Sequence, residues 1–472
     1  MEHFTHITES VLDEILRSRW GYDSFRYPQK EVILDLICGT NTLAIMPTGL
    51  GKSLCFQILA LLGRGLILVV TPLIALMDDQ VEQARSKGIR AACLHSSLLR
   101  QDQKLVIQRL HNKTLDLLFI SPERLGLKSF LSIISTLDLS LFVVDEAHCI
   151  SQWGYDFRPS YMEMHLFLNQ RKTISVLALT ATAPKHVQRD IRKQLQIKKS
   201  SVYQTSLYRQ NLQIQVQYAL DKIDFLVEML GSNQSSIIYL RHRRYVELIC
   251  VELGKRGVKA LPYHAGLDRS IRKQNQSRWM KDNVNCMVAT NAFGMGINKP
   301  NVRYVFHYKP PSSIEDYIQE IGRAGRDGEE SKCILLYNHK DLNALSAKIR
   351  DYSIFSIEAV DRTRKKSMRR MLGLITRDIC RFRYALDYFD ENLKIDCGKC
   401  DVCNNRIKDN HTKTKHLLKD FLGDIHIDQF IRQYPTKDHD KILKAVNNLI
   451  NEGRIKLKGA YLEWNKTYGN KS

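Results

Sequence analysis

The chain has 472 residues and a formal net charge of +21, so it is long enough for about three domains of roughly 150 residues each, with large buried cores. No apolar run approaches the ~20 residues that a membrane-spanning helix needs, and Met1 to Phe4 lack the basic and apolar regions of a secretory signal; both observations predict an intracellular protein. The positive charge favours a polyanionic partner, either nucleic acid or an anionic membrane surface, and by itself leaves a merely soluble basic protein equally open.

Continuous apolar runs alternate with helical patterns from about residue 30 to residue 340. Runs without polar alternation are typical of parallel strands that helices cover on both faces, so this part of the chain predicts α/β layers. A second series begins near Ser206, after the polar stretch 198–201, and we therefore predict two lobes, 1–205 and 206–340. The predicted strands are 42–46, 66–71, 115–120, 141–145 and 175–180 in the first lobe, and 237–240, 286–290, 302–307 and 332–337 in the second.

The segment from Met46 to Ser53 reads Met-Pro-Thr-Gly-Leu-Gly-Lys-Ser and lies between a predicted strand and a predicted helix. Glycines in such a loop let backbone N–H groups approach phosphate oxygens, and the following helix presents its positive end. The pattern predicts an ATP-binding cradle in which Lys52 reaches the β- and γ-phosphates and Ser53 binds Mg²⁺. Met46 stands where the usual pattern has glycine, and a plain glycine turn before a helix is the alternative. The other cradle residues are Thr48, Gly49 and Gly51.

Asp145-Glu146-Ala147-His148, a DEAH box, follows the apolar run 141–144. A carboxylate at the end of such a strand can hold Mg²⁺, and we assign this role to Asp145. Glu146 beside it can orient and deprotonate the attacking water. A lone Asp-Glu pair is usually a solvated turn, but the strand and the phosphate loop together predict nucleoside triphosphate hydrolysis.

Near the end of the second predicted lobe, the segment 319–328 carries Arg323 and Arg326 three residues apart. Two arginines on one helical face suit the charge that develops on a γ-phosphate, although an arginine pair alone is more often part of an exposed face. Because the phosphate loop lies in the opposite lobe, we predict that ATP occupies the cleft and closes it. Gln319, Arg323 and Arg326 then complete the catalytic set, with Arg326 as the arginine finger.

Beyond residue 340 the chain becomes helical and basic, with nine Lys or Arg against one acidic residue between Arg362 and Tyr384. Four of the eleven cysteines follow in a cluster: Cys380, then sixteen residues, then Cys397, Cys400 and Cys403. Four thiolates at this spacing predict one tetrahedral, structural Zn²⁺ in a domain spanning 341–405. Unliganded thiols or a redox pair are the alternative, and we interpret the seven scattered cysteines as reduced, mostly buried thiols.

A small final unit spans 411–472. Helical patterns precede the segment 453–464, which alternates around a Lys-Gly turn and predicts a β-hairpin. Helices followed by such a hairpin suggest a reduced winged-helix-like domain that binds DNA, and a small packing subdomain is the alternative.

In these residues the chain resembles the RecQ family of DNA helicases, within helicase superfamily 2, from about residue 15 to residue 405. In the segment 20–29, the resemblance implies that Gln29 reads the adenine edge, Tyr22 stacks on the ring and Arg26 assists. Cys380-Arg381 and the Cys397–Cys403 segment match the family's zinc-binding domain. Other segments resemble motifs that contact the DNA backbone, 71–80 and 121–125, and motifs that couple hydrolysis to lobe movement, 178–183 and 288–300.

The family-specific segment 149–159 lies directly after the acidic motif. Trp153 and Phe157, with Arg158, can stack on and grip single-stranded bases and so transmit DNA contact to Glu146; an aromatic loop packed into the core is the alternative. The chain departs from the family at Tyr155, where a His is usual, and at 298, an Asn where Asp is common.

The resemblance implies two tandem RecA-like lobes, a helical zinc-binding domain and the small C-terminal unit. It implies an ATP-dependent DNA helicase that uses ATP, Mg²⁺ and Zn²⁺, moves 3′ to 5′ on single-stranded DNA, and unwinds duplex or branched DNA in recombination and repair. An RNA helicase, and a DNA-binding or strand-annealing protein with a vestigial ATPase, are the rivals. We expect a monomer without membrane attachment, placed in the cytoplasm with the nucleoid in a bacterium or in the nucleus of a eukaryote, where single-strand-binding or repair proteins are candidate partners.

Overall fold

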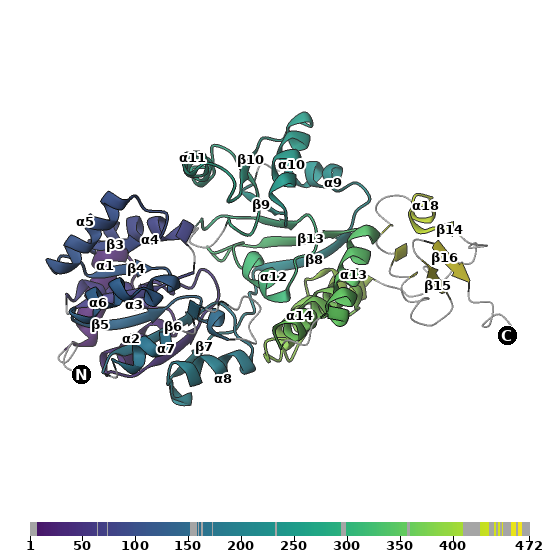
Figure 1. The fold of residues 1–472 in the computed structure, drawn as a ribbon. Coiled ribbons are helices and arrows are strands. Elements are labelled where there is room, and N and C mark those ends of the chain that lie inside the picture. The colour runs from purple at the N-terminus through teal and green to yellow at the C-terminus, as the bar shows by residue number, and fades with distance from the viewer. Residues whose placement is uncertain are drawn as a thin grey trace.

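The structure is a computed structural model of the chain (Figure 1). It describes residues 7–464 apart from 64, 73, 152–157, 159, 162–163, 172, 232–233, 294–298, 356–358, 409–424, 434–438, 440–441, 444–445, 447–454 and 459–460. In the view of Figure 1, the first lobe lies at the left in purple and blue, the second lobe lies in the centre in teal and green, and a small yellow sheet lies at the right.

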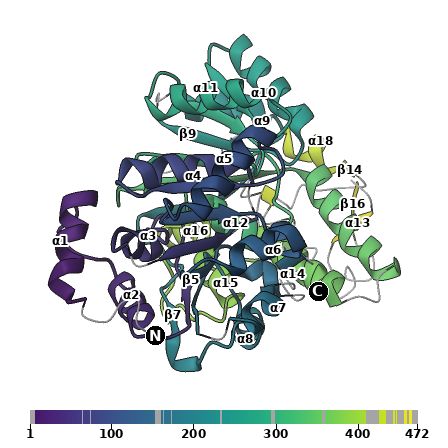
Figure 2. The same cartoon turned by 60° about the vertical axis from the view of Figure 1, so that its left-hand side comes forward.

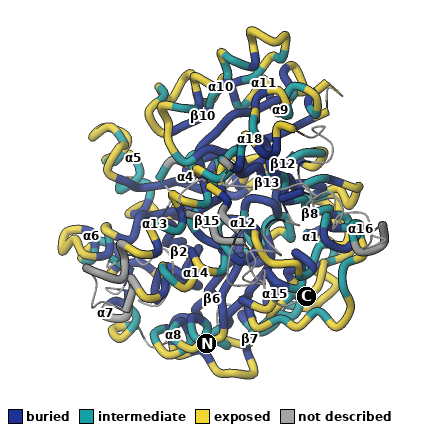
Figure 3. Tube along the Cα trace, turned by 90° about the vertical axis from the view of Figure 1, so that its right-hand side faces the viewer, coloured by how far each residue is buried: buried dark blue, intermediate teal, exposed yellow. Residues whose placement is uncertain are grey.

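Lobe 1 is built on a seven-stranded parallel sheet in the order β3-β4-β2-β5-β6-β1-β7. Its strands are β1 (Thr42–Ile45), β2 (Leu66–Val70), β3 (Ala91–Leu94), β4 (Leu117–Ile120), β5 (Leu139–Val144), β6 (Ser175–Thr180) and β7 (Val202–Gln204). The strands from β1 to β6 are buried at every position, as expected of apolar runs that helices cover on both faces. Figure 3 accordingly shows the strands in the colour of buried residues, whereas exposed residues gather on outer helices such as α5 and α8.

The helices of lobe 1 are α1 (Glu9–Trp20), α2 (Gln29–Ile37), α3 (Leu54–Leu61), α4 (Ile74–Ser86), α5 (Arg100–His111), α6 (Lys128–Ser135), α7 (Met164–Asn169) and α8 (Lys185–Gln194). Short 3₁₀ turns occur at Pro122–Gly126, Ala147–Ile150 and Lys199–Ser201. Helix α3 is buried over nearly its whole length, because it packs beneath the sheet behind the phosphate loop. This burial anchors the start of the helix, where the loop ends.

Lobe 2 holds a six-stranded parallel sheet in the order β10-β11-β9-β12-β13-β8. Its strands are β8 (Leu212–Tyr218), β9 (Ser236–Tyr239), β10 (Ala260–Tyr263), β11 (Cys286–Ala289), β12 (Tyr304–His307) and β13 (Ser331–Tyr337). Its helices are α9 (Lys222–Leu230), α10 (Arg243–Lys255), α11 (Arg269–Met280) and α12 (Ile314–Ile321). The prediction of two lobes with parallel sheets is confirmed.

Among the described strands of the two lobes, the sequence analysis did not predict four: β3, β7, β8 and β10. The clearest case is β8, whose sequence Leu-Gln-Ile-Gln-Val-Gln-Tyr buries every second residue at the edge of the sheet. A search for continuous apolar runs does not find a strand whose second face is only half covered. The other three span only three or four residues each.

The zinc-binding region follows with α13 (His339–Phe355), α14 (Ala359–Thr376), α15 (Arg381–Asp387) and α16 (Asp401–Lys408). Its apolar side chains join the core of lobe 2, since Met371, Leu374 and Phe382 belong to the same buried cluster as Tyr317 and Leu335. The region is therefore packed as an extension of lobe 2.

The C-terminal unit contains β14 (Ile425–His426), α18 (Ile427–Ile431), β15 (Ile455–Lys458) and β16 (Tyr461–Trp464). Strands β15 and β16 pair antiparallel, as the sequence predicted, and β14 adds a third strand on β16. The Tyr218 hydroxyl donates a hydrogen bond of 2.8 Å to Asp428, which ties this unit to β8. Among the described residues, none of the helices is long and apolar enough to cross a membrane.

The two lobes contact each other through α4 and α11. Asp78 pairs with Arg269 at 2.6 Å, Glu82 pairs with Lys273 at 2.8 Å, and Gln276 donates to Asp79 at 3.2 Å. Figure 2 shows α4 on the side of lobe 1 that faces the helices of lobe 2. This contact brings the two sheets close enough to share a cleft.

Candidate active site

A cavity of about 500 Å³ lies between the lobes and is lined by residues of both. On the lobe 1 side it lies at the carboxyl ends of β1, β2 and β5, where open α/β sheets place their ligands. The lining contains every residue that the sequence analysis assigned to ATP binding or hydrolysis: Tyr22, Arg26, Gln29, Thr48, Gly49, Gly51, Lys52, Ser53, Asp145, Glu146, Gln319, Arg323 and Arg326.

The phosphate loop connects β1 to α3 and takes its shape from two glycines. Gly49 and Gly51 have φ values of +93° and +76°, which only glycine adopts without strain. A Cβ at Gly49 would lie 3.1 Å from Cδ of Arg326, and a Cβ at Gly51 would lie 2.7 Å from Nε2 of Gln29. Both glycines therefore also make room for side chains that close over the loop.

Gln29 holds the loop from the N-terminal side. Its Nε2 donates to the carbonyl oxygens of Leu50 at 2.8 Å and Gly51 at 3.3 Å, and its Oε1 accepts from the backbone N–H of Arg26 at 2.9 Å. The sequence analysis placed this amide on the adenine edge. In the structure its hydrogen-bonding groups are engaged with the protein backbone beside the same cavity.

Lys52 and Ser53 lie at the end of the loop that faces the acidic residues. The Lys52 ammonium donates to the carbonyl oxygen of Met46 at 3.1 Å, and the Ser53 hydroxyl contacts Oε1 of Gln80 at 3.4 Å. Burial lowers the pKa of Lys52, while the carboxylates of Glu146 and Asp145 oppose that shift. A phosphate in the cavity would add negative charge to that of the two carboxylates and further stabilise this buried cation.

Asp145 follows β5, and its carboxylate is held by the backbone and by β2. Its Oδ1 accepts from the Glu146 N–H at 3.0 Å and its Oδ2 from the Thr71 hydroxyl at 3.3 Å. Burial, with the neighbouring Glu146 carboxylate, raises the pKa of Asp145 to about 6. Because burial disfavours the charged form of this carboxylate, a bound cation would stabilise it.

Glu146 has a positive φ of 47° and is buried beside His148. Its Oε2 lies 3.4 Å from Nδ1 of His148, and the same ring nitrogen lies 3.0 Å from the Thr180 hydroxyl at the end of β6. Thr180 in turn donates to the carbonyl oxygen of Thr182 at 3.0 Å. A chain of polar contacts thus joins the acidic pair to the segment 178–183.

Lobe 2 contributes α12 and the turn that follows it. Ser313 caps the helix by accepting from the Asp316 N–H at 2.9 Å, and Gln319, Arg323 and Arg326 line the cavity from this side. Burial, with the positive charge of Arg323, lowers the pKa of Arg326 to about 9. Two arginines that line the cavity from this side suit an anionic ligand between the lobes.

The turn that carries Arg326 is positioned by residues that the sequence analysis missed. The Arg209 guanidinium donates to the carbonyl oxygens of Ala324 at 3.3 Å and Gly325 at 2.5 Å, and the Asn211 amide donates to Gly325 at 2.8 Å. Gly325 has φ +55°, and a Cβ there would lie 2.4 Å from the Asn211 amide nitrogen. No sequence signal points to Arg209 and Asn211, because they lie more than a hundred positions away in the chain.

Helix α12 is also bonded to the zinc-binding region through a buried carboxylate. Glu315 accepts from the Tyr388 hydroxyl at 2.5 Å and from the Ser367 hydroxyl. Ser367 also accepts from the Ile314 N–H at 3.2 Å. Burial raises the pKa of Glu315, and both hydroxyl groups oppose that shift. The first turn of α12 is therefore fixed from outside lobe 2.

Of the three predicted DNA-contacting residues, Trp153 and Phe157 lie outside the described residues, as do positions 155 and 298. Arg158 is described. Its guanidinium donates to the carbonyl oxygen of Pro72 at 3.1 Å, and its backbone N–H donates to the carbonyl oxygen of Cys149 at 3.1 Å. Arg158 thus links the start and end of the aromatic segment to the segment 71–80.

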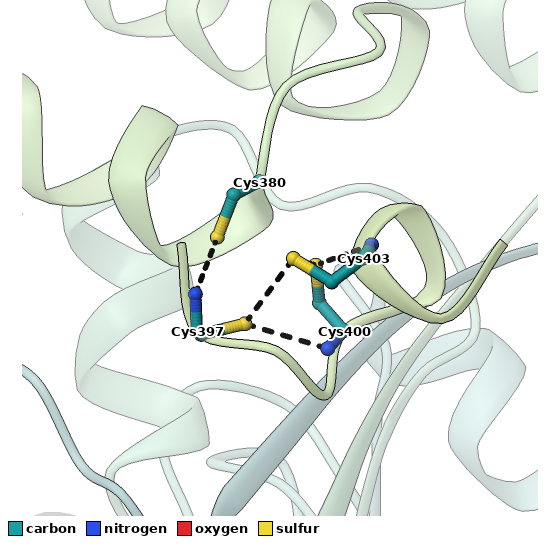
Figure 4. A group of neighbouring side chains, drawn as sticks. All are labelled: Cys380, Cys397, Cys400 and Cys403. Atoms are coloured by element: carbon teal, nitrogen blue, oxygen red, sulfur yellow. Dashed lines mark hydrogen bonds between the residues drawn. The ribbon is translucent and has the colours of Figure 1, made fainter. Parts of the chain in front are cut away.

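The four clustered cysteines come together at the junction of α15 and α16 (Figure 4). One Sγ from each lies within 4.8 Å of all the others, with 3.4 Å between Cys400 and Cys403 and 4.0 Å between Cys397 and Cys403. Zn–S bonds of about 2.3 Å place tetrahedral sulfurs about 3.8 Å apart, so this spacing fits one Zn²⁺.

The surroundings of the sulfurs also fit a metal site. Backbone N–H groups of Cys397, Cys400 and Cys403 donate to sulfurs of the cluster, which stabilises thiolates, and hydrogen bonds from neighbouring thiols hold the pKa of Cys380 far below its ordinary value. Arg381, beside Cys380, forms a bidentate ion pair with Asp401 at 3.0 and 2.7 Å. That pair fixes α15 against α16 on either side of the sulfurs.

Three family models match the chain in sequence: DEAD/DEAH box helicase over residues 26–190, helicase conserved C-terminal domain over 221–328, and RecQ zinc-binding over 339–404. The ATP-dependent DNA helicase RecQ of Synechocystis sp. is 40% identical over 338 residues, which cover 69% of this chain and 70% of that protein. The chain belongs to the RecQ family.

Other RecQ relatives are longer than this chain. ATP-dependent DNA helicase RecQ of Pasteurella multocida is 41% identical over 404 residues, which cover 85% of this chain and 63% of the relative. The chain therefore spans less than two thirds of that relative's length. The family membership confirms the resemblance that the motifs predicted, and it confirms the prediction of a zinc-binding region.

Solved helicase structures share the fold of this RecQ-family chain at low sequence identity. Mycobacterium smegmatis helicase Lhr, bound to single-stranded DNA and AMP-PNP, aligns with a TM-score of 0.60 at 17% identity and covers 99% of this chain and 61% of that one. Saccharomyces cerevisiae Dbp5, bound to RNA and ADP BeF3, aligns with a TM-score of 0.57 at 18% identity. The alignment covers 78% of this chain and 98% of that one. These similarities support the two-lobed helicase architecture.

Proposed function

We propose that this RecQ-family protein is an ATP-dependent DNA helicase that moves along single-stranded DNA and unwinds duplex or branched DNA in recombination and repair. The observation that carries the proposal is the inter-lobe cavity, which holds a phosphate loop and an acidic pair from one lobe and two arginines from the other. A site divided in this way binds its ligand tightly only when the lobes close, so ATP binding and hydrolysis can drive lobe movement.

Each residue of the cavity has a role in the proposed reaction. Lys52 binds the β- and γ-phosphates, and Ser53 and Asp145 are positioned to hold Mg²⁺, which neutralises phosphate charge when bound. Glu146 orients the attacking water and accepts its proton. Arg326, assisted by Arg323 and Gln319, stabilises the charge on the transferred γ-phosphoryl group from lobe 2.

The nucleotide base would lie near the N-terminal segment. Tyr22 is half exposed at the cavity, and Arg26 and Gln29 lie beside it. The resemblance assigns them stacking on and hydrogen bonding to adenine. Because the Gln29 amide is bonded to the phosphate loop in the structure, adenine binding would require it to exchange those bonds.

DNA contact would reach the acidic pair through the segment 149–159. Trp153, Phe157 and Arg158 are the proposed gripping residues, and the bond from Arg158 to Pro72 supports a path to the segment 71–80. The chain of contacts from Glu146 through His148 to Thr180 supports a route by which hydrolysis moves the lobes. The 3′-to-5′ direction follows from the resemblance alone.

We further propose that Cys380, Cys397, Cys400 and Cys403 hold one structural Zn²⁺, and that the domain boundaries lie near residues 205, 340 and 405. The C-terminal unit from 411 is a candidate DNA-binding domain. A DNA substrate would place the protein in the nucleoid of a bacterium or in the nucleus of a eukaryote, where it would act as a monomer.

Steady-state ATP hydrolysis, measured with and without single-stranded DNA for the wild type and for Glu146→Gln, tests the proposal. We expect DNA to stimulate the wild type strongly and the variant to lose hydrolysis. Hydrolysis indifferent to DNA would favour a binding or annealing protein. Unwinding of matched DNA and RNA duplexes decides the substrate, since faster RNA unwinding would favour an RNA helicase.

A further inference from the structure

Three side chains of lobe 1 with metal-binding groups meet outside the cleft and outside the four-cysteine cluster. Asp78 lies on α4, Cys93 lies on β3, and His95 follows two residues later, so that it shares a face of the extended chain with Cys93. One ligand atom from each lies within 4.8 Å of the other two. Cys93 is 7% exposed and His95 is 2% exposed.

The spacing of these atoms suits a small metal ion. The Cys93 Sγ lies 3.5 Å from Oδ1 of Asp78. Zinc bonds of about 2.0–2.3 Å to oxygen, nitrogen and sulfur put tetrahedral ligand atoms roughly 3.3–3.8 Å apart. The sulfur and oxygen are thus at ligand spacing already, and a ring nitrogen of His95 lies within 4.8 Å of both.

His95 and Asp78 each form a polar contact through the atom that would not bind the metal. Nδ1 of His95 lies 2.9 Å from the Ser97 hydroxyl, which orients the ring, and Nε2 is buried without a hydrogen-bond partner among the described residues. Oδ2 of Asp78 accepts a hydrogen bond from Arg269 at 2.6 Å, and Oδ1 is the carboxylate oxygen that faces Cys93. Metal-bound histidines and carboxylates have such outer partners.

The unbound cluster leaves its histidine poorly satisfied. Nε2 of His95 is buried and has no hydrogen-bond partner among the described residues, and a metal ion would supply one. The scattered cysteines otherwise fit the interpretation of reduced thiols; Cys93 differs because two further ligand types face it.

We propose that Asp78, Cys93 and His95 form a second metal site for a thiophilic divalent cation such as Zn²⁺, with a water molecule in the fourth position. One oxygen, one sulfur and one nitrogen are ligands that Zn²⁺ accepts, whereas Mg²⁺ requires oxygen. The partly exposed Asp78 gives the ion access from solvent. This proposal does not depend on the proposed helicase activity.

The test is the zinc content of the full-length protein after equilibrium dialysis against buffered free Zn²⁺ and removal of unbound metal. We expect wild type to retain two zinc ions per chain. Cys93→Ser and His95→Gln should each retain one, the ion of the four-cysteine cluster. The matched control is Cys286→Ser, which removes a buried thiol on β11 of lobe 2 and should retain two.

Thermal unfolding and circular dichroism check that each variant is folded, and His95→Gln gives the same readout if Cys93→Ser does not fold. A wild type that saturates at one zinc would overturn the proposal. So would folded Cys93→Ser and His95→Gln variants that both retain two ions, because the second ion would then lie elsewhere. Loss of one ion in both variants, with the control unchanged, supports it.

Discussion

The two sides of the inter-lobe cavity are built in different ways. The lobe 1 side consists of loops that follow β1, β2 and β5 of one sheet. Its residues bond one another: Lys52 to Met46, and Asp145 to Glu146 and Thr71. The lobe 2 side depends on a helix and a turn that are fixed by distant residues. Arg209 and Asn211 hold the turn, and Glu315 is bonded to Ser367 and Tyr388 of the zinc-binding region.

This difference predicts separate effects on nucleotide binding and on catalysis. A perturbation of the phosphate loop should affect nucleotide and metal binding directly. A perturbation of Glu146 should affect the chemical step, and a perturbation of the zinc-binding region should reach the reaction through the position of α12 and Arg326. We therefore expect the zinc-binding region to have a second role beyond stability, because it bonds the first turn of the helix that leads to Gln319, Arg323 and Arg326. Four predictions test this division, from the largest expected effect to the smallest.

The first prediction concerns the lobe 2 arginine. Arg326→Ala should lower kcat for ATP hydrolysis by about 10³-fold, the lower end of the usual arginine-finger effect. Nucleotide affinity, measured by fluorescence titration with a nucleotide analogue, should change far less, because the phosphate loop is intact. Arg326→Lys keeps the charge and loses the planar fork, so it should recover only part of the rate. Equal losses in affinity and kcat would contradict the division.

The second prediction concerns the lobe 1 base. Glu146→Gln should lower kcat by about 10²-fold or more, since general-base catalysis typically contributes 10²–10⁴-fold. The substitution preserves shape and hydrogen bonding toward His148, so nucleotide binding should persist. Single-turnover hydrolysis separates this loss in chemistry from slow product release. A variant with wild-type single-turnover rates would require a different base.

The third prediction concerns removal of the structural zinc. Cys397→Ser should lower the zinc content and the melting temperature, because the metal joins α15 to α16. In the fraction that remains folded, kcat should fall more than nucleotide affinity, since α12 loses its support. Cys286→Ser, which removes a buried thiol outside the four-cysteine cluster, is the control. A folded variant with unchanged zinc content would refute the ligand assignment. A stable and fully active variant that has lost the zinc of the four-cysteine cluster would refute the structural role of that ion and the coupling.

The fourth prediction concerns the bond between α12 and the zinc-binding region. Tyr388→Phe should lower the free energy of unfolding by about 1.5–3 kcal/mol, because Glu315 loses a hydrogen bond in the interior. It should lower kcat several-fold while KM for ATP is nearly unchanged. Tyr384→Phe is the control, because that hydroxyl lies against Gly373 of α14 and its loss leaves the Glu315 contacts in place. A change in stability without any change in kcat would limit Tyr388 to a structural role.

Much of this molecule could be predicted from local patterns. Buried parallel strands are continuous apolar runs, so most strands of both sheets were predicted, whereas the half-covered β8 and the short β3, β7 and β10 were not. Metal and phosphate sites depend on residues close in sequence, and the phosphate loop, the acidic pair and the cysteine cluster were therefore visible as motifs. The structure places all of them where the motifs indicated.

Contacts between distant segments could not be predicted in this way. The sequence by itself determined the family and the two-lobed α/β fold, and it indicated the side chains that we propose for ATP chemistry, because each depends on short-range spacing and apolar pattern. Only the tertiary structure decided that Gln29 bonds the phosphate loop, that Arg209 and Asn211 hold the turn of Arg326, and that Tyr388 bonds Glu315. Those contacts depend on how the strands and helices pack, which no local pattern specifies.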